Sequence, residues 1–506
     1  MRKYKLRQKI KSIAENERIQ IGVCFAFLLF MMVFNLMHSS LWGDEWVEYY
    51  YSQKAIKTGD MHAAIVSTFQ PPLYNVLMHF WLKISQSLVW FRFFNVVLGF
   101  IAAVFIYKTN QKLHGRRMGL ITVAILAVCY QWIYFIQECS EYTLMLMWLC
   151  AAIYFYVSCC EEFSYRMMAG FVLSSVLAIY SQYGSVFVAV PLLALFFFGT
   201  VFNAEVHLKR KIIVLATYGF SFIAFAIPLY VFYLREQMEN NAISDNTVSF
   251  SGETIRDIPF VFGQIIGFFF GVNEGEVWTV VLSIISVIIL ALCFMIVIKN
   301  KVDWTKKSII IVLLVAYVLH FLLVQMHIYA MAHPGKSAGF FVRYSLFYIP
   351  LCCVAFPIVG TECRAIFDEF AFWKKIAIAG VAVCILTTSF VTVMNNWNKA
   401  LDDKFIKIWE ENEGWKDQTY LFGVDYGFYY YVKQLDNYDE SFLEKATKKI
   451  DLNNLPERFW AWRINWGGDG WQRTIDKARN LGYTVTVYVD SNYNGQLAFC
   501  ELEEQS

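Results

Sequence analysis

Long apolar runs, separated by short polar connections, make up most of the chain. A helix that crosses a bilayer needs about 20 apolar residues, and eleven runs reach or approach that length. They lie at residues 21–41, 88–108, 118–136, 141–160, 165–181, 184–203, 211–234, 276–298, 307–328, 341–360 and 374–395. The pattern predicts a polytopic α-helical membrane protein of about eleven transmembrane helices, with residues 21–395 as its transmembrane domain.

The composition agrees with this class of protein. Of the 506 residues, 58% are hydrophobic and 17% are charged, whereas soluble domains carry about 25% charged residues. The net charge of +2 and the lack of a basic stripe interleaved with aromatic residues give no sign of a nucleic-acid partner. The twelve cysteines are mostly scattered through apolar runs without metal-ligand spacing, so we expect no metal site built on them.

Lysine and arginine residues predict the orientation, because cytoplasmic connections are enriched in them. If the eleven spans alternate, every basic connection falls on the cytoplasmic side of the inner or plasma membrane, together with the N-terminal residues 1–20. No cleavage pattern follows the first run, so we expect it to be retained as a span. The basic residues are Arg2, Lys3, Lys5, Arg7, Lys9, Lys11, Lys108, Lys112, Arg116, Arg117, Lys209, Arg210, Lys211, Lys299, Lys301, Lys306, Lys307, Lys374 and Lys375.

Two shorter apolar segments do not fit as spans. Residues 71–85 open with a Pro-Pro pair and are only about 15 residues long, which favours a juxtamembrane or re-entrant helix. The segment 258–271 is interpreted in the same way. Counting residues 71–85 as a span would invert every later connection, so residues 42–87 are expected to form one large first outer loop.

The polar region 396–506 has the pattern of a small α/β domain outside the membrane. It predicts strands at 419–424, 459–464, 483–489 and 496–502, helices at 428–435 and 470–481, and a turn at Asn494-Gly495 between the last two strands. Its tryptophans favour either a domain core or a surface on which sugar rings stack. These are Trp460, Trp462, Trp466 and Trp471.

Acidic residues at the mouth of the first span are the most informative polar feature. Asp44 and Glu45 stand between Trp42 and Trp46 in an otherwise apolar stretch, and ionisable groups at membrane depth are rare and usually functional. A helix starting after Gly43 would place Asp44 and Glu48 on one face. For Glu48, and for Glu141 in a later connection, a solvated position among lipid headgroups is an equally good interpretation.

Other polar residues are expected on the same outer side. As candidates for donor or acceptor binding we select Glu48, His62, Gln70, Tyr74, Gln137, Tyr142, Lys336, Arg343 and Tyr344, with Glu138 beside Asp44 and Glu45 as a catalytic candidate. Tyr74 and Trp81 are also typical of interface anchors or packing residues. Arg343 is either a snorkelling cation or a partner for a phosphate, which suits its planar fork of donors.

Three elements in this order resemble the membrane-embedded, polyprenyl-phosphate-dependent glycosyltransferases of the C-type superfamily (family 39-like). This superfamily includes protein O-mannosyltransferases and the aminoarabinose transferases that modify lipid A. The elements are Asp44-Glu45 after the first span, Gln70-Pro71-Pro72-Leu73-Tyr74 opening a short helix, and Gln137-Glu138-Cys139-Ser140-Glu141-Tyr142 after the third span. Arg343-Tyr344 followed by an apolar run to Pro350 is similar as well.

The resemblance implies a C-type glycosyltransferase fold and transfer of a hexose or pentose, with inversion, from a polyprenyl phosphate to a hydroxyl of an envelope lipid, polysaccharide or protein. Asp44 would be the base, with Glu45 or Glu138 positioning the acceptor or the base. No sugar nucleotide and no firm cofactor are implied, although a divalent cation remains open because some relatives are inferred to bind one.

The sequence departs from the family pattern at two positions. Gln70 stands where histidine or lysine is common, and Ser140 replaces the usual arginine. The phosphate-binding role of that arginine would fall to Arg343, Lys336 or Arg235, and the sequence does not choose among them.

Two other functions remain as alternatives. A transporter or flippase for lipid-linked sugars predicts charges in the middle of spans and internal repeats, neither of which is clear here. A scaffold or receptor anchored by its spans leaves the polar first outer loop unexplained.

Overall fold

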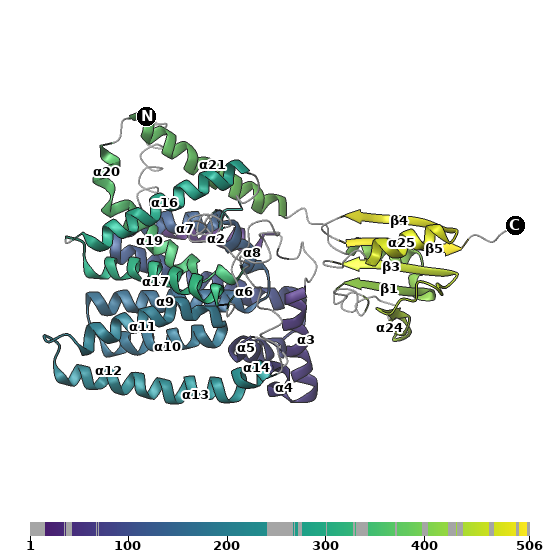
Figure 1. The fold of residues 1–506 in the computed structure, drawn as a ribbon, viewed down its shortest axis with the longest axis horizontal. Helices are drawn as coiled ribbons and strands as arrows, with labels where there is room; N and C mark the ends of the chain where they lie inside the picture. The colour runs from purple at the N-terminus through teal and green to yellow at the C-terminus, as the bar shows by residue number, and fades with distance from the viewer. Residues whose placement is uncertain are drawn as a thin grey trace, which may run out of the picture. The chain divides into compact units, whose positions relative to one another are not determined.

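The computed structural model describes residues 16–34, 36, 43–66, 68, 70–239, 267, 269–271, 276–299, 301–326, 329, 343–369, 372–396, 403–423, 432, 439–464, 470–491 and 495–502. The chain divides into two compact units. One comprises residues 1–34 and 51–393, and the other comprises residues 35–50 and 394–506. The first unit is helical and the second contains a β-sheet (Figure 1).

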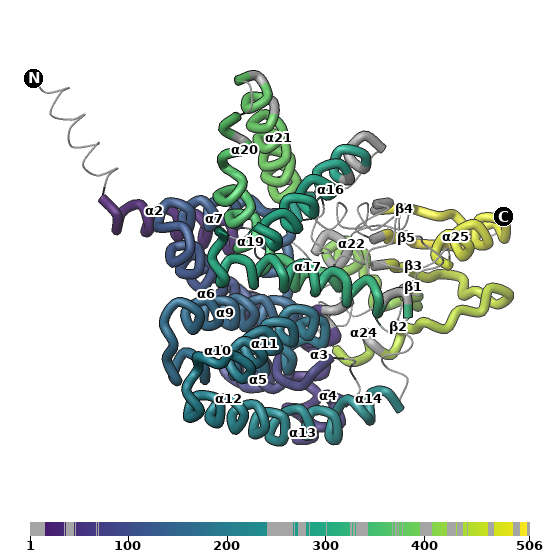
Figure 2. Tube along the Cα trace, turned by 60° about the vertical axis from the view of Figure 1, so that its left-hand side comes forward, coloured from purple at the N-terminus to yellow at the C-terminus, as the bar shows by residue number. Residues whose placement is uncertain are grey.

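The helical unit is a multi-pass membrane protein. Among the described residues, seven helical segments are long and apolar enough to cross a membrane, or eight if one bent pair counts as a single span. The long helices are α2 (Glu17–Val33), α6 (Leu88–His114), α7 (Arg116–Val128), α9 (Glu141–Glu161), α10 (Tyr165–Ser181), α11 (Val186–Val201), α12 (Leu208–Ser221), α16 (Glu276–Ile298), α17 (Trp304–Gln325), α19 (Tyr348–Glu362) and α21 (Phe372–Asn396). Figure 2 shows α9, α10 and α11 packed side by side.

The helices differ from the predicted spans in three places. The predicted span 118–136 is not one straight helix, because α7 and α8 (Tyr130–Gln137) meet at a 65° bend. The helix predicted at 21–41 ends at Val33. The run 341–360 holds a short 3₁₀ turn, η6 (Arg343–Ser345), before α19 begins at Tyr348. Hydropathy measures apolar length and does not detect such breaks.

A side chain from a distant helix stabilises the bend between α7 and α8. Cys129 is extended there, so the backbone groups on either side lose their helical partners. The Ser389 hydroxyl of α21 donates to the carbonyl of Val128 over 2.7 Å and accepts from the backbone N–H of Tyr130 over 3.0 Å. A single hydroxyl therefore satisfies both backbone groups, as buried polar groups require.

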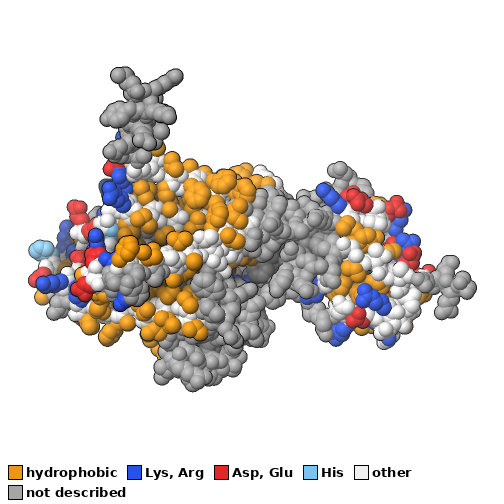
Figure 3. Space-filling model, turned by 90° about the horizontal axis from the view of Figure 1, so that it is seen from above, with side chains coloured by type: hydrophobic (Ala, Val, Ile, Leu, Met, Phe, Trp, Pro, Cys, Tyr) orange, Lys and Arg blue, Asp and Glu red, His pale blue; other side chains and the backbone are white. Residues whose placement is uncertain are grey.

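The connections predicted to be cytoplasmic gather at one end of the helical unit. Lys112 pairs with Glu161 at 3.1 Å, and Lys306 pairs with Glu362 at 2.7 Å. The Thr361 hydroxyl lies 3.4 Å from His114 Nδ1. The charged side chains at the left-hand end of Figure 3 mark this end, beside a band of apolar side chains.

Short helices form the opposite end. They are α3 (Gly43–Thr58), α4 (Met61–Val66), α5 (Pro72–Leu82) and α14 (Arg235–Glu239), and they lie together in Figure 1. Pro72 suits the first position of α5, where a missing N–H costs nothing. Trp81 of α5 and Trp90 of α6 hold the two helices together. Their indole rings stack with the ring centroids 4.1 Å apart, and each indole N–H donates to the backbone carbonyl of the other tryptophan. The short helix predicted within residues 71–85 is thus present, whereas residues 258–266 lie outside the described residues.

The second unit contains a five-stranded sheet in the order β2-β1-β3-β5-β4. The strands are β1 (Gln418–Gly423), β2 (Ala446–Thr447), β3 (Arg458–Ile464), β4 (Tyr483–Ser491) and β5 (Gly495–Leu502). β1 pairs in parallel with β2 and β3, while β5 pairs antiparallel with β3 and β4. The four predicted strands correspond to β1, β3, β4 and β5, and the helix predicted at 470–481 to α25 (Gly470–Asn480). The helix predicted at 428–435 falls almost entirely outside the described residues.

Alternation along β3 builds a core on each side of this sheet. Trp460 and Trp462 pack with Trp409 of α22 (Asp403–Glu411). Phe459 packs on the other side with Trp471 of α25. Trp460, Trp462 and Trp471 are at most 2% exposed, so the interpretation of these three as a sugar-stacking surface is wrong, and Trp466 lies outside the described residues.

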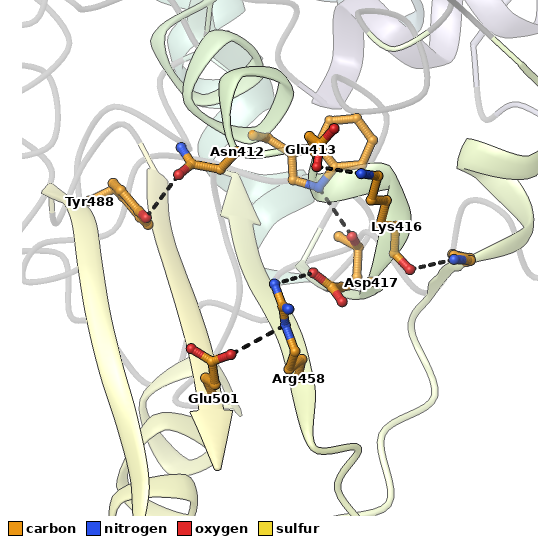
Figure 4. Close-up of polar contacts among 10 residues, drawn as sticks. Asn412, Glu413, Lys416, Asp417, Arg458, Tyr488 and Glu501 are labelled. Carbon is orange, nitrogen blue, oxygen red and sulfur yellow. Dashed lines mark hydrogen bonds and ion pairs between the residues drawn. The ribbon is translucent and has the colours of Figure 1, made fainter. Parts of the chain in front are cut away.

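Polar contacts at the sheet surface connect β3 to its neighbours (Figure 4). Arg458 donates to Asp417 over 3.4 Å and lies 3.5 Å from Glu501 of β5. The Tyr488 hydroxyl of β4 donates to Asn412 over 3.3 Å. Because Arg458, Glu501, Asn412 and Tyr488 are exposed, each contact contributes at most about 1 kcal/mol, and the two aromatic cores carry the stability of the sheet.

Candidate active site

Tyr74 connects two of the sequence elements described above. It lies in the first turn of α5 and is fully buried. Its hydroxyl donates to Asn95 Oδ1 of α6 over 3.2 Å and lies 3.0 Å from Cys139 Sγ. The Cys139 thiol also donates to the Phe91 carbonyl over 3.1 Å. The Gln70–Tyr74 and Gln137–Tyr142 elements, which are far apart in sequence, therefore meet through α6.

Asn95 fixes the backbone of the loop between α8 and α9. Its amide nitrogen donates to the carbonyls of Glu138 at 2.7 Å and Ser140 at 3.0 Å, and to the Thr143 hydroxyl at 3.3 Å. Thr143 in turn donates to the Phe135 carbonyl over 2.7 Å. All of these groups are buried, so each bond replaces one that water would otherwise make. The conformation of the loop that carries Glu138 is thereby fixed.

Gln137 connects this loop to the end of the first long helix. Its side-chain amide donates to the carbonyls of Met31, Met32 and Phe34, over 3.3, 3.2 and 2.8 Å. These carbonyls lie at the C-terminus of α2, where helical partners are missing. Gln137 thus acts as a cap for α2, which precedes the segment carrying Asp44.

Gln70 is bound through its backbone. The buried side chain of Gln237 in α14 donates to the Gln70 carbonyl over 2.8 Å and accepts from the Tyr183 hydroxyl over 2.8 Å. The Gln70 side chain itself is 7% exposed. Gln237 therefore joins the Gln70–Tyr74 element to the connection that follows α10.

The candidate carboxylates are buried where their side chains are described. Glu45 and Glu48 are 2% and 3% exposed, and Glu138 and Glu141 are 5% and 2% exposed. The interpretation of Glu48 and Glu141 as solvated headgroup-level residues is therefore wrong. Asp44 lies in the first turn of α3, and its side chain lies outside the described part of the structure.

The second half of α3 packs on α5. The backbone of Ser52 is hydrogen-bonded to His79, and the Gln53 amide donates to Gln86 over 3.0 Å. Burial and the charge of Lys83 lower the pKa of His79, while the Ser52 bond raises it. The second half of α3, residues 51–58, is thereby connected to the helical unit.

Arg343 and Tyr344 lie in the η6 turn and are both buried. The Arg343 guanidinium donates to the Tyr344 hydroxyl over 3.3 Å. The Tyr344 ring packs edge-to-face with Tyr329, whose hydroxyl accepts from Gln182 over 3.3 Å. The pKa of the Tyr329 phenol is raised, chiefly by burial. The hydrogen bond from Gln182 lowers this pKa, and the charges of Tyr344 and Glu141 raise it further. Arg343 is thus connected through Tyr344 and Tyr329 to Gln182, which directly follows α10.

The structure distinguishes among the cations considered for phosphate binding. Arg235 is 60% exposed and pairs with Glu239 at 3.2 Å within one helix, while Lys336 lies outside the described residues. Sequence reasoning missed Arg92, which is 0% exposed and lies one turn from Asn95 in α6. Its position inside an apolar run was the available signal, because an arginine at membrane depth usually marks a functional site.

His62 and Tyr142 are the two remaining candidates whose side chains are described. The His62 ring is half-exposed and lies 2.9 Å from the Phe232 carbonyl oxygen and 3.8 Å from Glu236. The Tyr142 ring is buried edge-to-face against Phe135 at 5.5 Å. The His62 contact joins α4 to the segment before α14, and the Tyr142 contact joins α9 to α8. In the described part of the chain, no three His, Cys, Asp or Glu side chains are placed to hold a metal ion.

One family model matches part of the chain. Residues 69–231, which are 163 of the 506 residues, match the family model described as dolichyl-phosphate-mannose-protein mannosyltransferase. The match contains both the Gln70–Tyr74 and Gln137–Tyr142 elements, and it confirms the resemblance to the polyprenyl-phosphate-dependent glycosyltransferases. None of the curated proteins matches the chain.

Solved structures of two kinds are similar to this chain. ArnT from Cupriavidus metallidurans bound to undecaprenyl phosphate is 11% identical with a TM-score of 0.41, over 95% of this chain and 97% of ArnT. The Archaeoglobus fulgidus oligosaccharyltransferase in complex with Zn and sulfate is 14% identical with a TM-score of 0.42, over 75% and 53% of the two chains. The same enzyme tethered to an acceptor peptide is 11% identical with a TM-score of 0.46, over 94% and 70%.

Proposed function

We propose that this protein is an inverting glycosyltransferase that moves a sugar from a polyprenyl-phosphate donor to a hydroxyl acceptor at the outer face of the membrane. The observation that carries the proposal is the junction of Tyr74, Asn95 and the Glu138 loop. It brings two motifs of the matched family together at one end of the helical unit, and Gln137 connects the same loop to α2.

The reaction needs a base, an acceptor and a stabilised leaving group. Asp44 takes the proton from the acceptor hydroxyl, and the hydroxyl oxygen bonds to the anomeric carbon of the sugar. The bond between that carbon and the phosphate oxygen breaks, and its electron pair remains on the phosphate. A general acid is unnecessary because a phosphate leaves well, so the remaining requirement is positive charge near it.

Arg343 and Arg92 are our candidates for that positive charge. Both are buried, and a buried guanidinium binds phosphate through two parallel hydrogen bonds at low desolvation cost relative to an ammonium. Arg235 is less suitable because its side chain is 60% exposed. The buried carboxylates Glu45 and Glu138 would position the base or the acceptor.

The test is a transfer assay with the purified full-length protein reconstituted in sealed liposomes. Polyprenyl-phosphate sugars carrying hexoses or pentoses are supplied with hydroxyl acceptors, and free polyprenyl phosphate is measured. Release of polyprenyl phosphate that depends on the protein supports the proposal. Movement of the intact lipid-linked sugar across the bilayer without its cleavage would instead favour a transporter.

A further inference from the structure

A pocket lies at the end of the helical unit opposite the candidate active site. It has a volume of about 730 Å³ and is lined by two connections, α9–α10 and α11–α12. Phe163 and Tyr165 line the pocket with aromatic rings, and His207, Lys209 and Arg210 line it with basic side chains. The only acidic residue in its lining is Glu205, which is exposed. The pocket therefore combines apolar walls with an excess of positive charge.

Arg210 is held in this pocket by an aromatic ring. Its guanidinium carbon lies 3.5 Å from the centroid of the Phe163 ring, a close cation–π contact. Its Nε is buried and has no hydrogen-bond acceptor in the described part of the chain. Stacking fixes the plane of the guanidinium and leaves its donor edge for a planar anion such as a phosphate.

The charges around Arg210 are unfavourable without an anion. α12 begins at Leu208, has no acidic residue in its first turn and lacks a side-chain cap. Lys209 and Arg210 thus lie at the positive end of the helix dipole, where cations are disfavoured and anions are stabilised. Two cations at the N-terminus of α12, beside an open pocket, indicate that the pocket binds an anionic group.

The surroundings indicate a lipid as the source of that group. Exposed apolar side chains adjoin the pocket, with Phe202 73%, Leu208 71% and Ile212 55% exposed. In a membrane protein such side chains contact acyl chains, and basic pockets between helices bind lipid headgroups. We propose that this pocket binds the phosphate headgroup of an anionic membrane lipid, with Arg210 and Lys209 as its main ligands.

Native mass spectrometry of the full chain in detergent tests this proposal. With equal amounts of phosphatidylglycerol and phosphatidylcholine, the wild-type protein should retain the anionic lipid about tenfold better, a difference of about 1.4 kcal/mol. Arg210→Gln should remove most of this preference. Lys209→Gln should also lower the preference for the anionic lipid. Because Lys209 is exposed and its replacement leaves the Phe163 contact intact, this variant serves as the test if Arg210→Gln folds poorly.

Arg117→Gln is the matched control, because Arg117 is an exposed cation near the same end that does not line the pocket. It should leave the preference unchanged. Equal retention of both lipids by the wild type, or an unchanged preference in Lys209→Gln and Arg210→Gln, would overturn the proposal. Displacement of the lipid by millimolar inorganic phosphate alone would show a site for free phosphate and not for a lipid.

Discussion

The Tyr74 hydroxyl donates to Asn95 Oδ1 over 3.2 Å, and through this contact α5 is connected to the loop that carries Glu138. Asn95 is the centre of the arrangement because its amide nitrogen also reaches the Ser140 carbonyl and the Thr143 hydroxyl. One buried asparagine therefore positions a loop on which the proposed chemistry depends.

Replacing Asn95 with alanine should reduce both stability and transfer. The Glu138 carbonyl would keep the Ser140 N–H as a donor. The Ser140 carbonyl and the Thr143 hydroxyl, however, would lose the Asn95 amide, and each group left unsatisfied costs about 1–3 kcal/mol. Displacement of the Glu138 loop should lower kcat/KM at least about tenfold. Thermal unfolding and transfer kinetics of the purified variant measure the two effects.

Asn110→Ala provides the control for this variant. Asn110 is also fully buried in α6, and its amide donates to the carbonyls of Ile106 and Cys353 at the other end of the helix. We expect it to lose stability while its activity per folded molecule stays at the wild-type level. Equal losses of activity in Asn95→Ala and Asn110→Ala would argue against a specific role for Asn95.

The arginine that binds the donor phosphate should be sensitive to lysine replacement. Lysine keeps the charge but lacks the planar fork. We expect Arg343→Lys or Arg92→Lys to raise the KM for the donor at least about tenfold with a smaller effect on the acceptor. Arg235→Lys, at an exposed ion-paired position, should behave as the wild type. Normal donor KM values in both buried variants would exclude these arginines.

His79 should make the stability of the helical unit depend on pH. Its pKa is lowered in the folded state, chiefly by burial, so the unfolded chain binds a proton first as the pH falls. The stabilisation is complete above the unfolded pKa of about 6.5 and is lost progressively below it. The Tm of the wild type should therefore fall more between pH 7 and pH 5 than the Tm of His79→Gln. Parallel decreases would contradict this assignment.

The apolar pattern alone predicted most helix positions, because burial in lipid leaves helices as the usual solution. It did not predict the bend at Cys129. No proline or glycine marks that position, and the bend depends on Ser389, which is 260 residues away in the chain. The strands β3, β4 and β5 were predicted because alternation and turn residues are local signals.

The candidate site was predicted in part. The acidic and aromatic residues of the outer connections were recognisable because they interrupt apolar runs. Arg92 and Asn95 were missed since they lie within a run that was interpreted only as a span. Their roles come from tertiary contacts, as with Gln137, whose capping of α2 has no counterpart in the local sequence.

The most direct test of the proposed function is the transfer rate of Asp44→Asn beside that of Asp60→Asn. The amide cannot take the acceptor proton, so Asp44→Asn should lower kcat by about 10²–10⁴ while the protein still folds. Asp60 is exposed and caps α4 through the Ala63 N–H, a role that asparagine fills equally well, so Asp60→Asn should keep its full rate. Full transfer activity in Asp44→Asn would contradict the assignment of Asp44 as the base.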